Sequence, residues 1–437
     1  MTLLFVTANN IFGVNRPERW TNCANDVRLK MIKRAIKDHV LQTSKTFPVL
    51  LLTGMRQVGK SFLLNVIKEE NRKYVSLDDF SLREFAKRDP KLFLETYSAP
   101  IIIDEIQYAT ELFTYIKIFV DKNPKQKGMF WLSGSQKFDL MNGVQETLAG
   151  RIAILELSGL SLREMSENTD KSEPFLPSFE MLKSVNFETK TPSIDDIYNI
   201  IWRGFYPEIV DNQEIKRDTF YKSYVQTYIE RDVRDDIGEK NVLSFYDFIR
   251  AVAARTGNLL NYEDIARDCS INVKTARKWL ETLIQAGIVY LLEPFSKNIS
   301  KRIVKSPKIY FLDTGLCAYL TKWDSPQTLM NGAMNGAFLE TFVFTEILKS
   351  YQNTGKEESI YFYRDSKKNE IDFIIERNMT LYPIKVKKSA NPKESDINSF
   401  SLLLTERVNV STGVLLCFYP SVLPLNKQNL SIPIWEI

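Results

Sequence analysis

One short stretch of the chain combines residue types and spacing that suit phosphate chemistry. Residues 54–61 fit the pattern G-x-x-x-x-G-K-S, with Gly54 and Gly59 at the glycine positions, followed by Lys60 and Ser61. Glycines let the backbone curl so that successive N–H groups face an anion, while the lysine amine suits a phosphate and the serine hydroxyl suits Mg²⁺. A glycine-rich turn without a ligand is the alternative, and the pattern favours a site for ATP and Mg²⁺. The predicted nucleotide-binding residues are Gly54, Arg56, Gln57, Val58, Gly59, Lys60 and Ser61.

A second candidate group follows a fully apolar segment. Residues 100–103 read Pro-Ile-Ile-Ile, and Asp104 and Glu105 come directly after them. An aspartate at the carboxyl end of a buried strand can hold Mg²⁺, and the adjacent glutamate can polarise an attacking water. Such a strand end is common by itself, but its place after a phosphate-binding pattern supports the assignment. We therefore predict that Asp104 joins Ser61 at the metal and that Glu105 acts in catalysis with Lys60.

Three further residues are candidates on less specific grounds. Ser135 follows the apolar segment 129–133, where a polar side chain could sense the γ-phosphate, although a serine at a strand end is ordinary. Arg151 could contact a phosphate in its own or a neighbouring subunit, as arginine fingers do, or form a structural ion pair. Arg231 is a candidate second sensor, with a pairing to a nearby acid as the alternative.

The elements that must position these residues alternate along the first part of the chain. The expected strands are 49–52, 74–78, 100–104, 129–133 and 152–157, and the expected helices are 26–40, 61–69 and 81–95. Alternation of this kind predicts an α/β fold with a mostly parallel sheet, helices on both faces and the nucleotide at the carboxyl ends of the strands.

The middle of the chain changes character twice. Residues 166–193 are polar and weakly periodic, which indicates a linker, and 194–256 show helical spacing that predicts a lid beside the nucleotide site. Residues 261–294 then read as helix, short turn, helix and strand, the outline of a winged helix-turn-helix. Its basic residues are Lys274, Arg277, Lys278, Lys297, Lys301, Arg302, Lys305 and Lys308. Duplex DNA is one predicted partner of this surface, and docking of a protein is the alternative.

The last region, 308–437, contains the outline of a restriction-endonuclease-like α/β domain. A helix carries Glu340, a strand carries Asp372, and a later strand leads to Lys387. In such a site two carboxylates bind a metal and the lysine steadies charge on phosphate. The second strand acid should stand two residues before the lysine, but this position is Lys385, and Glu370 is the available substitute. A structural or binding role is therefore favoured over an active nuclease.

Composition sets the broad class. The chain has 437 residues, of which 44% are hydrophobic and 26% charged, with a net charge of +4. This is the composition of a globular protein with several domains. Four scattered cysteines and a single histidine argue against a zinc site or a disulfide framework and favour the cytoplasm. We expect no membrane span and no signal peptide, and the chain start is open between Met1 and Met31.

Taken together, the motifs resemble an AAA-related P-loop ATPase family of bacteria and archaea over nearly all of 31–437. The segments that carry the resemblance are Leu-Thr-Gly-Met-Arg-Gln-Val-Gly-Lys-Ser, Ile-Ile-Asp-Glu-Ile-Gln, Leu-Ser-Gly-Ser-Gln, Leu-Ala-Gly-Arg-Ile, Arg-Gly-Phe-Tyr-Pro-Glu, Tyr-Ile-Glu-Arg-Asp-Val and Lys-Ser-Pro-Lys-Ile-Tyr-Phe-Leu-Asp-Thr-Gly. The resemblance implies ATP binding, an added strand between the two motif-bearing strands, a winged helix and a C-terminal domain of unknown function. Met55 replaces the usual proline and Lys385 replaces the usual glutamate, which weighs against nuclease chemistry.

The predicted organisation has five parts. Residues 1–30 form an extension, 31–165 the P-loop core, 166–257 the linker and lid, 258–307 the winged helix and 308–437 the endonuclease-like domain. We predict an ATPase that acts as a switch or motor, with DNA, a protein partner or a second copy of the chain as candidate partners. The alternatives are a nucleotide-gated binding module without turnover and an ATP-controlled nuclease. The sequence leaves the biological role and the oligomeric state open.

Overall fold

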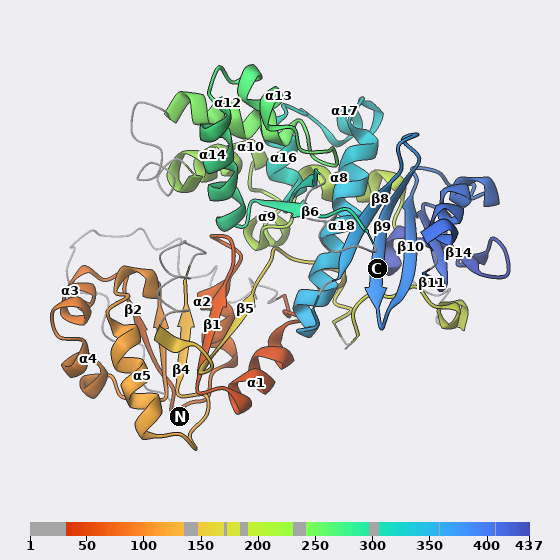
Figure 1. Cartoon of the computed structure of the whole chain (residues 1–437). Helices are drawn as coiled ribbons and strands as arrows, with labels where there is room; N and C mark the ends of the chain where they lie inside the picture. The colour runs from red at the N-terminus through yellow and green to blue at the C-terminus, as the bar shows by residue number, and fades with distance from the viewer. Residues whose placement is uncertain are drawn as a thin grey trace, which may run out of the picture.

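The computed structural model describes residues 32–134, 147–169, 173–183, 191–229, 242–296, 306–357, 359–406 and 408–437. Figure 1 shows a first α/β region at the lower left, a mainly helical region above it and a second sheet at the right. The predicted site residues Ser135 and Arg231 lie outside the described residues, as do the basic residues at 297, 301, 302 and 305.

The first region is a parallel sheet in the order β2-β3-β4-β1-β5. Its strands are β1 (Val49–Thr53), β2 (Lys73–Ser76), β3 (Ile101–Asp104), β4 (Phe130–Ser133) and β5 (Ile152–Glu156). Strands β1, β3 and β4 are buried along their whole length, as their apolar sequences predict. Strand β4 lies between β1 and β3, which confirms the added strand between the two motif-bearing strands.

Helices α1 (Lys37–Thr46), α2 (Lys60–Ile67) and α5 (Leu112–Lys122) accompany this sheet. The single helix expected over 81–95 is instead two helices, α3 (Phe80–Arg88) and α4 (Pro90–Thr96). The break falls at Asp89, because Pro90 cannot donate a helical hydrogen bond and disfavours helical backbone before it. The Asp89 side chain then accepts a hydrogen bond from the N–H of Leu92 and caps the second helix.

The middle region is mainly helical. Its elements are α7 (Leu162–Met165), α8 (Ile194–Arg203), α9 (Pro207–Asp211), α10 (Arg217–Tyr224), α12 (Val242–Ala253), α13 (Tyr262–Asp268), α14 (Val273–Gln285), β6 (Val289–Leu292), β7 (Lys308–Phe311), α16 (Thr314–Leu320) and α17 (Pro326–Asn331). Strands β6 and β7 form their own antiparallel pair, in which Leu292 faces Lys308. The strand at 308–311 therefore pairs with the middle region, whereas we placed it at the start of the C-terminal domain.

Two sequence segments that carry the family resemblance meet at a buried aspartate. Asp313, which precedes α16, accepts hydrogen bonds from the N–H of Phe205 at 2.8 Å and from the hydroxyl of Tyr221 at 2.7 Å. Gly204 and Gly315 lie against the same tyrosine hydroxyl, and a Cβ at either position would come within 2.3 Å of it. The Arg-Gly-Phe-Tyr-Pro-Glu and Leu-Asp-Thr-Gly segments thus fix helices α8, α10 and α16 to one another.

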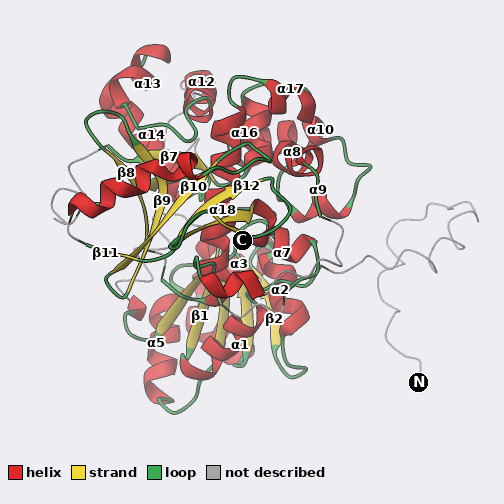
Figure 2. Cartoon of the chain, turned by 90° about the vertical axis from the view of Figure 1, so that its right-hand side faces the viewer, coloured by secondary structure: helices red, strands yellow, loops and turns green. Residues whose placement is uncertain are grey.

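The C-terminal region is a mixed sheet with the long helix α18 (Asn335–Thr354) beside it (Figure 2). The strands are β8 (Ile360–Arg364), β9 (Glu370–Arg377), β10 (Thr380–Val386), β11 (Asn409–Val410), β12 (Gly413–Cys417), β13 (Leu423–Pro424) and β14 (Asn429–Pro433). The sheet order is β13-β14-β12-β10-β9-β8, and β11 pairs with β10. The 3₁₀ segments η6 (Glu394–Glu406) and η7 (Ile434–Glu436) complete the region.

Helix α18 also attaches the C-terminal region to the first sheet. The buried side chain of Glu346 accepts a hydrogen bond from the N–H of Leu162 at 2.7 Å, just after β5. Lys349, also buried, donates to the carbonyl of Leu160 at 2.9 Å and to Glu346 at 2.8 Å. These contacts pair both buried charges, as burial requires, and join α18 to residues 160–162, which follow β5.

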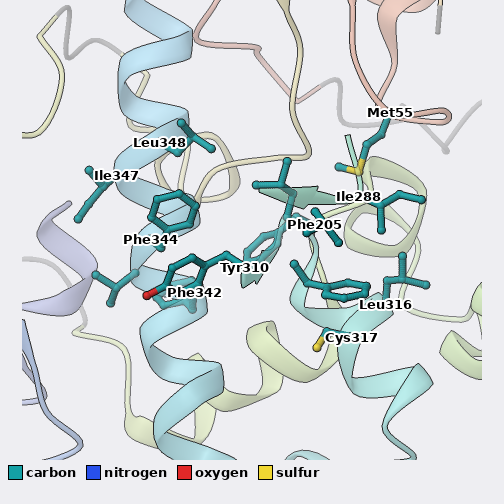
Figure 3. Close-up of a cluster of buried hydrophobic side chains, with 14 of the residues drawn as sticks. Met55, Phe205, Ile288, Tyr310, Leu316, Cys317, Phe342, Phe344, Ile347 and Leu348 are labelled. Atoms are coloured by element: carbon teal, nitrogen blue, oxygen red, sulfur yellow. The ribbon is translucent and has the colours of Figure 1, made fainter. Parts of the chain in front are cut away.

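Apolar packing runs continuously through the three regions. Figure 3 shows Met55 of the first region, Leu316 of α16 and Phe344 of α18 in one cluster of buried side chains. The ring of Tyr310 stacks on Phe344 with the ring centroids 4.5 Å apart. A second buried cluster fills the other side of the first sheet. The P-loop region therefore shares its core with the rest of the chain.

Candidate nucleotide site

The phosphate-loop pattern forms a tight turn between β1 and α2. The backbone at Gly54, Gln57 and Gly59 has positive φ values of 137°, 63° and 91°. A Cβ at Gly54 would lie 2.1 Å from the carbonyl oxygen of Leu157, so only glycine fits there. The sequence thus places glycine where the loop must curl and pass close to β5.

Lys60 begins α2 and points back into the loop. Its ammonium is buried and donates hydrogen bonds to the carbonyl oxygens of Gly54 at 2.9 Å and Met55 at 2.7 Å. A charged amine enclosed by the loop and beside a helix N-terminus is suited to a phosphate group. Lys60 therefore lies within the loop, and its contact with a phosphate stays a prediction.

The two motifs meet at Asp104. The hydroxyl of Ser61 donates to Asp104 Oδ1 at 2.9 Å, and Ser133, at the end of β4, donates to the same oxygen. The hydroxyl of Tyr74 donates to Asp104 Oδ2 at 2.8 Å. Carboxylate and hydroxyl oxygens are ligands that Mg²⁺ prefers, so the donor set fits the predicted metal. Of these residues, the sequence predicts Ser61 and Asp104 but gives no signal for Tyr74.

Glu105 follows Asp104 in a left-handed backbone conformation, with φ of 55°. This conformation is uncommon for a residue with a side chain and often marks a functional position. Its carboxylate accepts a hydrogen bond from the side-chain amide of Gln107, which holds it from one side, and the residue remains partly exposed. Glu105 is therefore an oriented acid at the carboxyl edge of β3.

The buried ion pair between Arg34 and Glu164 supports the phosphate loop. The guanidinium of Arg34 donates to the carbonyl oxygens of Val58 and Ser158, both at 2.7 Å, and to Glu164 at 2.9 Å. Glu164 also accepts from the N–H of Ala35 at 2.8 Å. Arg34 lies within the helix that we expected over 26–40, but α1 begins only at Lys37. The spacing of apolar residues indicated the segment and did not reveal its arginine as a support of the phosphate loop.

Arg151 lies at the end of the first sheet opposite the phosphate loop. It precedes β5 at the end where Val49 pairs with Ile152, and its backbone carbonyl accepts from the N–H of Val49, whereas the phosphate loop follows the opposite end of β1. Its guanidinium forms an ion pair with Asp121 at 2.6 Å. This position contradicts the prediction that Arg151 contacts a phosphate in its own subunit. A contact with a phosphate in a neighbouring subunit stays a prediction.

The middle region borders the loop. The hydroxyl of Tyr206 donates to the sulfur of Met55 at 3.6 Å. A cavity of about 450 Å³ is lined by Gln57 of the loop and by Glu208, Ile215, Lys216, Thr219, Phe220, Ser223 and Tyr224. Helices α9 and α10 thus stand beside the loop, where the sequence predicts a lid.

Those predicted basic residues of the winged helix that the structure describes fall into two groups. Lys274, Arg277 and Lys278 are exposed on α14, and the guanidinium of Arg277 stacks on the ring of Tyr262 at 4.2 Å. Lys308, in contrast, is buried, and its ammonium donates to Glu340 at 2.7 Å and also to Glu370. The expectation that Lys308 belongs to a basic surface is therefore wrong.

The predicted C-terminal acids do come together. One carboxylate oxygen each from Glu340, Glu370 and Asp372 lies within 4.8 Å of the others. Glu370 begins β9 and reaches the cluster as the substitute acid we considered. Lys385 stands where the family usually has glutamate and donates to Asp372 at 2.6 Å. Burial raises the pKa of Asp372 above its usual value, and the nearby Glu340 raises it further while Lys385 and Lys308 oppose the shift.

The fold and the nucleotide site define an AAA-related P-loop ATPase core joined to a separate C-terminal α/β sheet domain. Family models agree: residues 46–166 match an AAA domain, while 194–327 and 335–437 each match a domain of unknown function. The chain therefore contains an AAA-related P-loop domain and, at its C-terminal end, a domain of unknown function. None of the helices in the described ranges is both long and apolar enough to cross a membrane.

The curated relatives carry no named activity. Two uncharacterized proteins, one from Mycobacterium tuberculosis and one from Mycobacterium bovis, are each 26% identical over 392 residues, which cover 89% of this chain and 81% of theirs. Among solved structures, AMPPCP-bound DnaA from Aquifex aeolicus is 14% identical, covering 57% of this chain and 86% of its own, with a TM-score of 0.27. RuvB from Thermotoga maritima is 16% identical, covering 58% and 86%, with a TM-score of 0.27.

Proposed function

We propose that this protein binds ATP with Mg²⁺ and hydrolyses it, and that the cycle drives a switch or motor. The observation that carries the proposal is the hydrogen bond between Ser61 and Asp104 at 2.9 Å, because it joins the two sequence motifs at the carboxyl edge of one sheet. Ligands at this edge are the rule for open α/β sheets. The AAA family match over 46–166 supports the same assignment.

Each residue has a defined task in this proposal. The backbone of 54–59 and the ammonium of Lys60 hold the phosphates. Ser61 and Asp104 hold Mg²⁺, which supplies positive charge against the phosphate oxygens. Glu105 orients the attacking water and accepts its proton on the carboxylate. The cavity beside Gln57 lies between the loop and helices α9 and α10, so these helices are placed to respond to the bound nucleotide.

A nucleotide-gated module without turnover is the principal alternative. It needs the same loop and the same metal residues but gives Glu105 no role. The left-handed backbone of Glu105 and its bond to Gln107 favour hydrolysis, because both orient the acid. The measurement that separates the two is ATP turnover by the purified chain, which hydrolysis requires and gating alone does not.

A second candidate function is binding of duplex DNA by α14 as the reading helix of a winged helix. Helices α12, α13 and α14 followed by the β6–β7 pair match the order of that motif. The exposed Lys274, Arg277 and Lys278 supply positive charge on one helix. Assaying turnover with and without a DNA duplex tests this candidate alongside the first. A second copy of the chain as partner, with Arg151 facing its nucleotide, remains part of the proposal.

The three cysteines in the described ranges are free thiols. This supports the proposed location in the reducing cytoplasm.

A further inference from the structure

The cluster of C-terminal acids contains a cation that belongs to another part of the chain. Lys308 is the first residue of β7, whose strand pairs with β6 of the middle region. Its side chain is 2% exposed and ends between Glu340 of α18 and Glu370 of β9. Lys308 also falls within the family match over 194–327, whereas the acids fall within the match over 335–437. The contact therefore joins two separate family domains.

Five of the six carboxylate oxygens of the cluster already accept a hydrogen bond or face a cation. Glu340 Oε1 accepts from Lys308 at 2.7 Å and from the hydroxyl of Tyr310 at 2.6 Å. Asp372 Oδ1 accepts from Lys385 at 2.6 Å, and its Oδ2 accepts from the N–H of Val386 at 2.7 Å. A divalent ion would have to displace the ammonium groups of Lys308 and Lys385 from the oxygens that it needs as ligands.

The charges of the cluster balance as well. Glu370 meets Lys308 through Oε1 and faces Arg364 through Oε2 at 3.4 Å. Three carboxylates therefore meet three cations, which are Lys308, Lys385 and Arg364. Buried charges are tolerated when each is paired. An additional divalent ion would leave this closed network with unpaired positive charge.

We infer that Lys308 is the resident cation of the Glu340–Glu370–Asp372 cluster, and that its ammonium stands where an endonuclease-like fold would hold a metal. The carboxylates of the cluster thus bind the ammonium group of a lysine from the same chain. This contact holds the C-terminal domain against the β6–β7 pair, and the cluster does not bind a catalytic metal while Lys308 is in place. This inference is independent of ATP binding.

The first test measures metal binding. Mn²⁺ is titrated into nucleotide-free protein and the free ion is followed by electron paramagnetic resonance, for the wild-type chain and for Glu340→Gln. We expect the two proteins to bind the same number of Mn²⁺ ions per chain, because Glu340 already binds Lys308. One ion fewer per chain in Glu340→Gln would overturn the inference, since the cluster would then be a metal site.

The second test uses thermal melting to measure how much the contact of Lys308 with Glu340 and Glu370 stabilises the protein. We call this contact the ammonium lock. Lys308→Met removes the buried ammonium that Glu340 and Glu370 share and should lower the melting temperature by about 5 °C or more. The double variant Lys308→Met/Glu340→Gln should lose less than the sum of the two single variants, because it removes both partners. The control is Lys356→Met, whose pair with Glu173 is largely exposed and should melt as the wild type does.

Two outcomes of the melting series would contradict the lock: a Lys308→Met variant as stable as the wild type, or single effects that simply add. If Lys308→Met does not fold, a folded double variant supports the coupling and an unfolded one contradicts it. The Mn²⁺ titration needs neither variant and decides the metal question by itself.

Discussion

The hydroxyl of Tyr74 donates a hydrogen bond to Oδ2 of Asp104 at 2.8 Å, while Ser61 holds Oδ1 at 2.9 Å. Tyr74 lies on the edge strand β2, which pairs directly with β3. Burial raises the pKa of Tyr74, and the hydrogen bond to Asp104 raises it further, so the hydroxyl keeps its proton at neutral pH. The edge strand thereby orients the carboxylate that we assign to Mg²⁺.

Tyr74→Phe should weaken the Mg²⁺ dependence of ATP turnover. Loss of one hydrogen bond to a charged group costs about 1.5 kcal/mol, or roughly tenfold in affinity. We expect the Mg²⁺ concentration for half-maximal turnover to rise by up to about tenfold, with turnover at saturating Mg²⁺ little changed. Turnover is measured across a Mg²⁺ series, with Tyr115→Phe as the matched control, since Tyr115 is a partly exposed tyrosine on α5. An unchanged Mg²⁺ curve would remove Tyr74 from the site.

The sequence predicts the first sheet and its candidate site because each signal is local. Each pattern, an apolar run followed by a glycine or by acids, lies within a few consecutive residues, as at Gly54 and at Asp104. It can therefore be recognised without knowledge of the tertiary fold. The helix over 81–95 was wrong because apolar spacing concealed the break that Pro90 imposes. Tyr74 and Arg34 act through partners distant in the chain, and no spacing rule reports such contacts.

The same reasoning explains the error at Lys308. A lysine in a basic stretch ordinarily belongs to an exposed surface. Its burial depends on acids of α18 and β9 that only the tertiary fold brings to it. The sequence did predict the acids Glu340 and Asp372 and the unusual Lys385, because a helix glutamate, a strand aspartate and a later strand leading to a lysine outline an endonuclease-like site. The spacing does not indicate that Lys308, a cation that balances these acids, comes from another family domain.

Lys60→Ala should strongly weaken ATP binding. A charged hydrogen bond to phosphate contributes about 1.5–3 kcal/mol, so the dissociation constant should rise by roughly ten- to a hundredfold or more. Binding of a fluorescent ATP analogue measures the change. Lys87→Ala is the control, because Lys87 is exposed on α3. A melting curve checks that the loop survives the loss of the bonds from Lys60 to Gly54 and Met55. Equal affinity in a folded Lys60→Ala variant would refute the loop assignment.

The DNA candidate rests on three exposed cations of α14. Replacing Lys274, Arg277 and Lys278 together by Ala should weaken duplex binding and flatten its salt dependence by up to about three counterions, while ATP binding stays unchanged. Labelled duplex is titrated at low and moderate salt. The control replaces Lys122, Lys125 and Lys127, which are exposed in the first region and carry the same total charge. Equal loss in both triple variants, or no binding at low salt, would instead favour α14 as a protein-docking helix.

The most direct test of the account is single-turnover hydrolysis of ATP by wild type and Glu105→Gln. The variant keeps the shape of the side chain but removes its ability to accept a proton. Its ATP affinity should therefore stay within about twofold of wild type, while hydrolysis falls by about 10²-fold or more. Glu111→Gln, an exposed glutamate before α5, should hydrolyse ATP like the wild type. Equal hydrolysis rates for wild type and Glu105→Gln would contradict the proposed catalytic role.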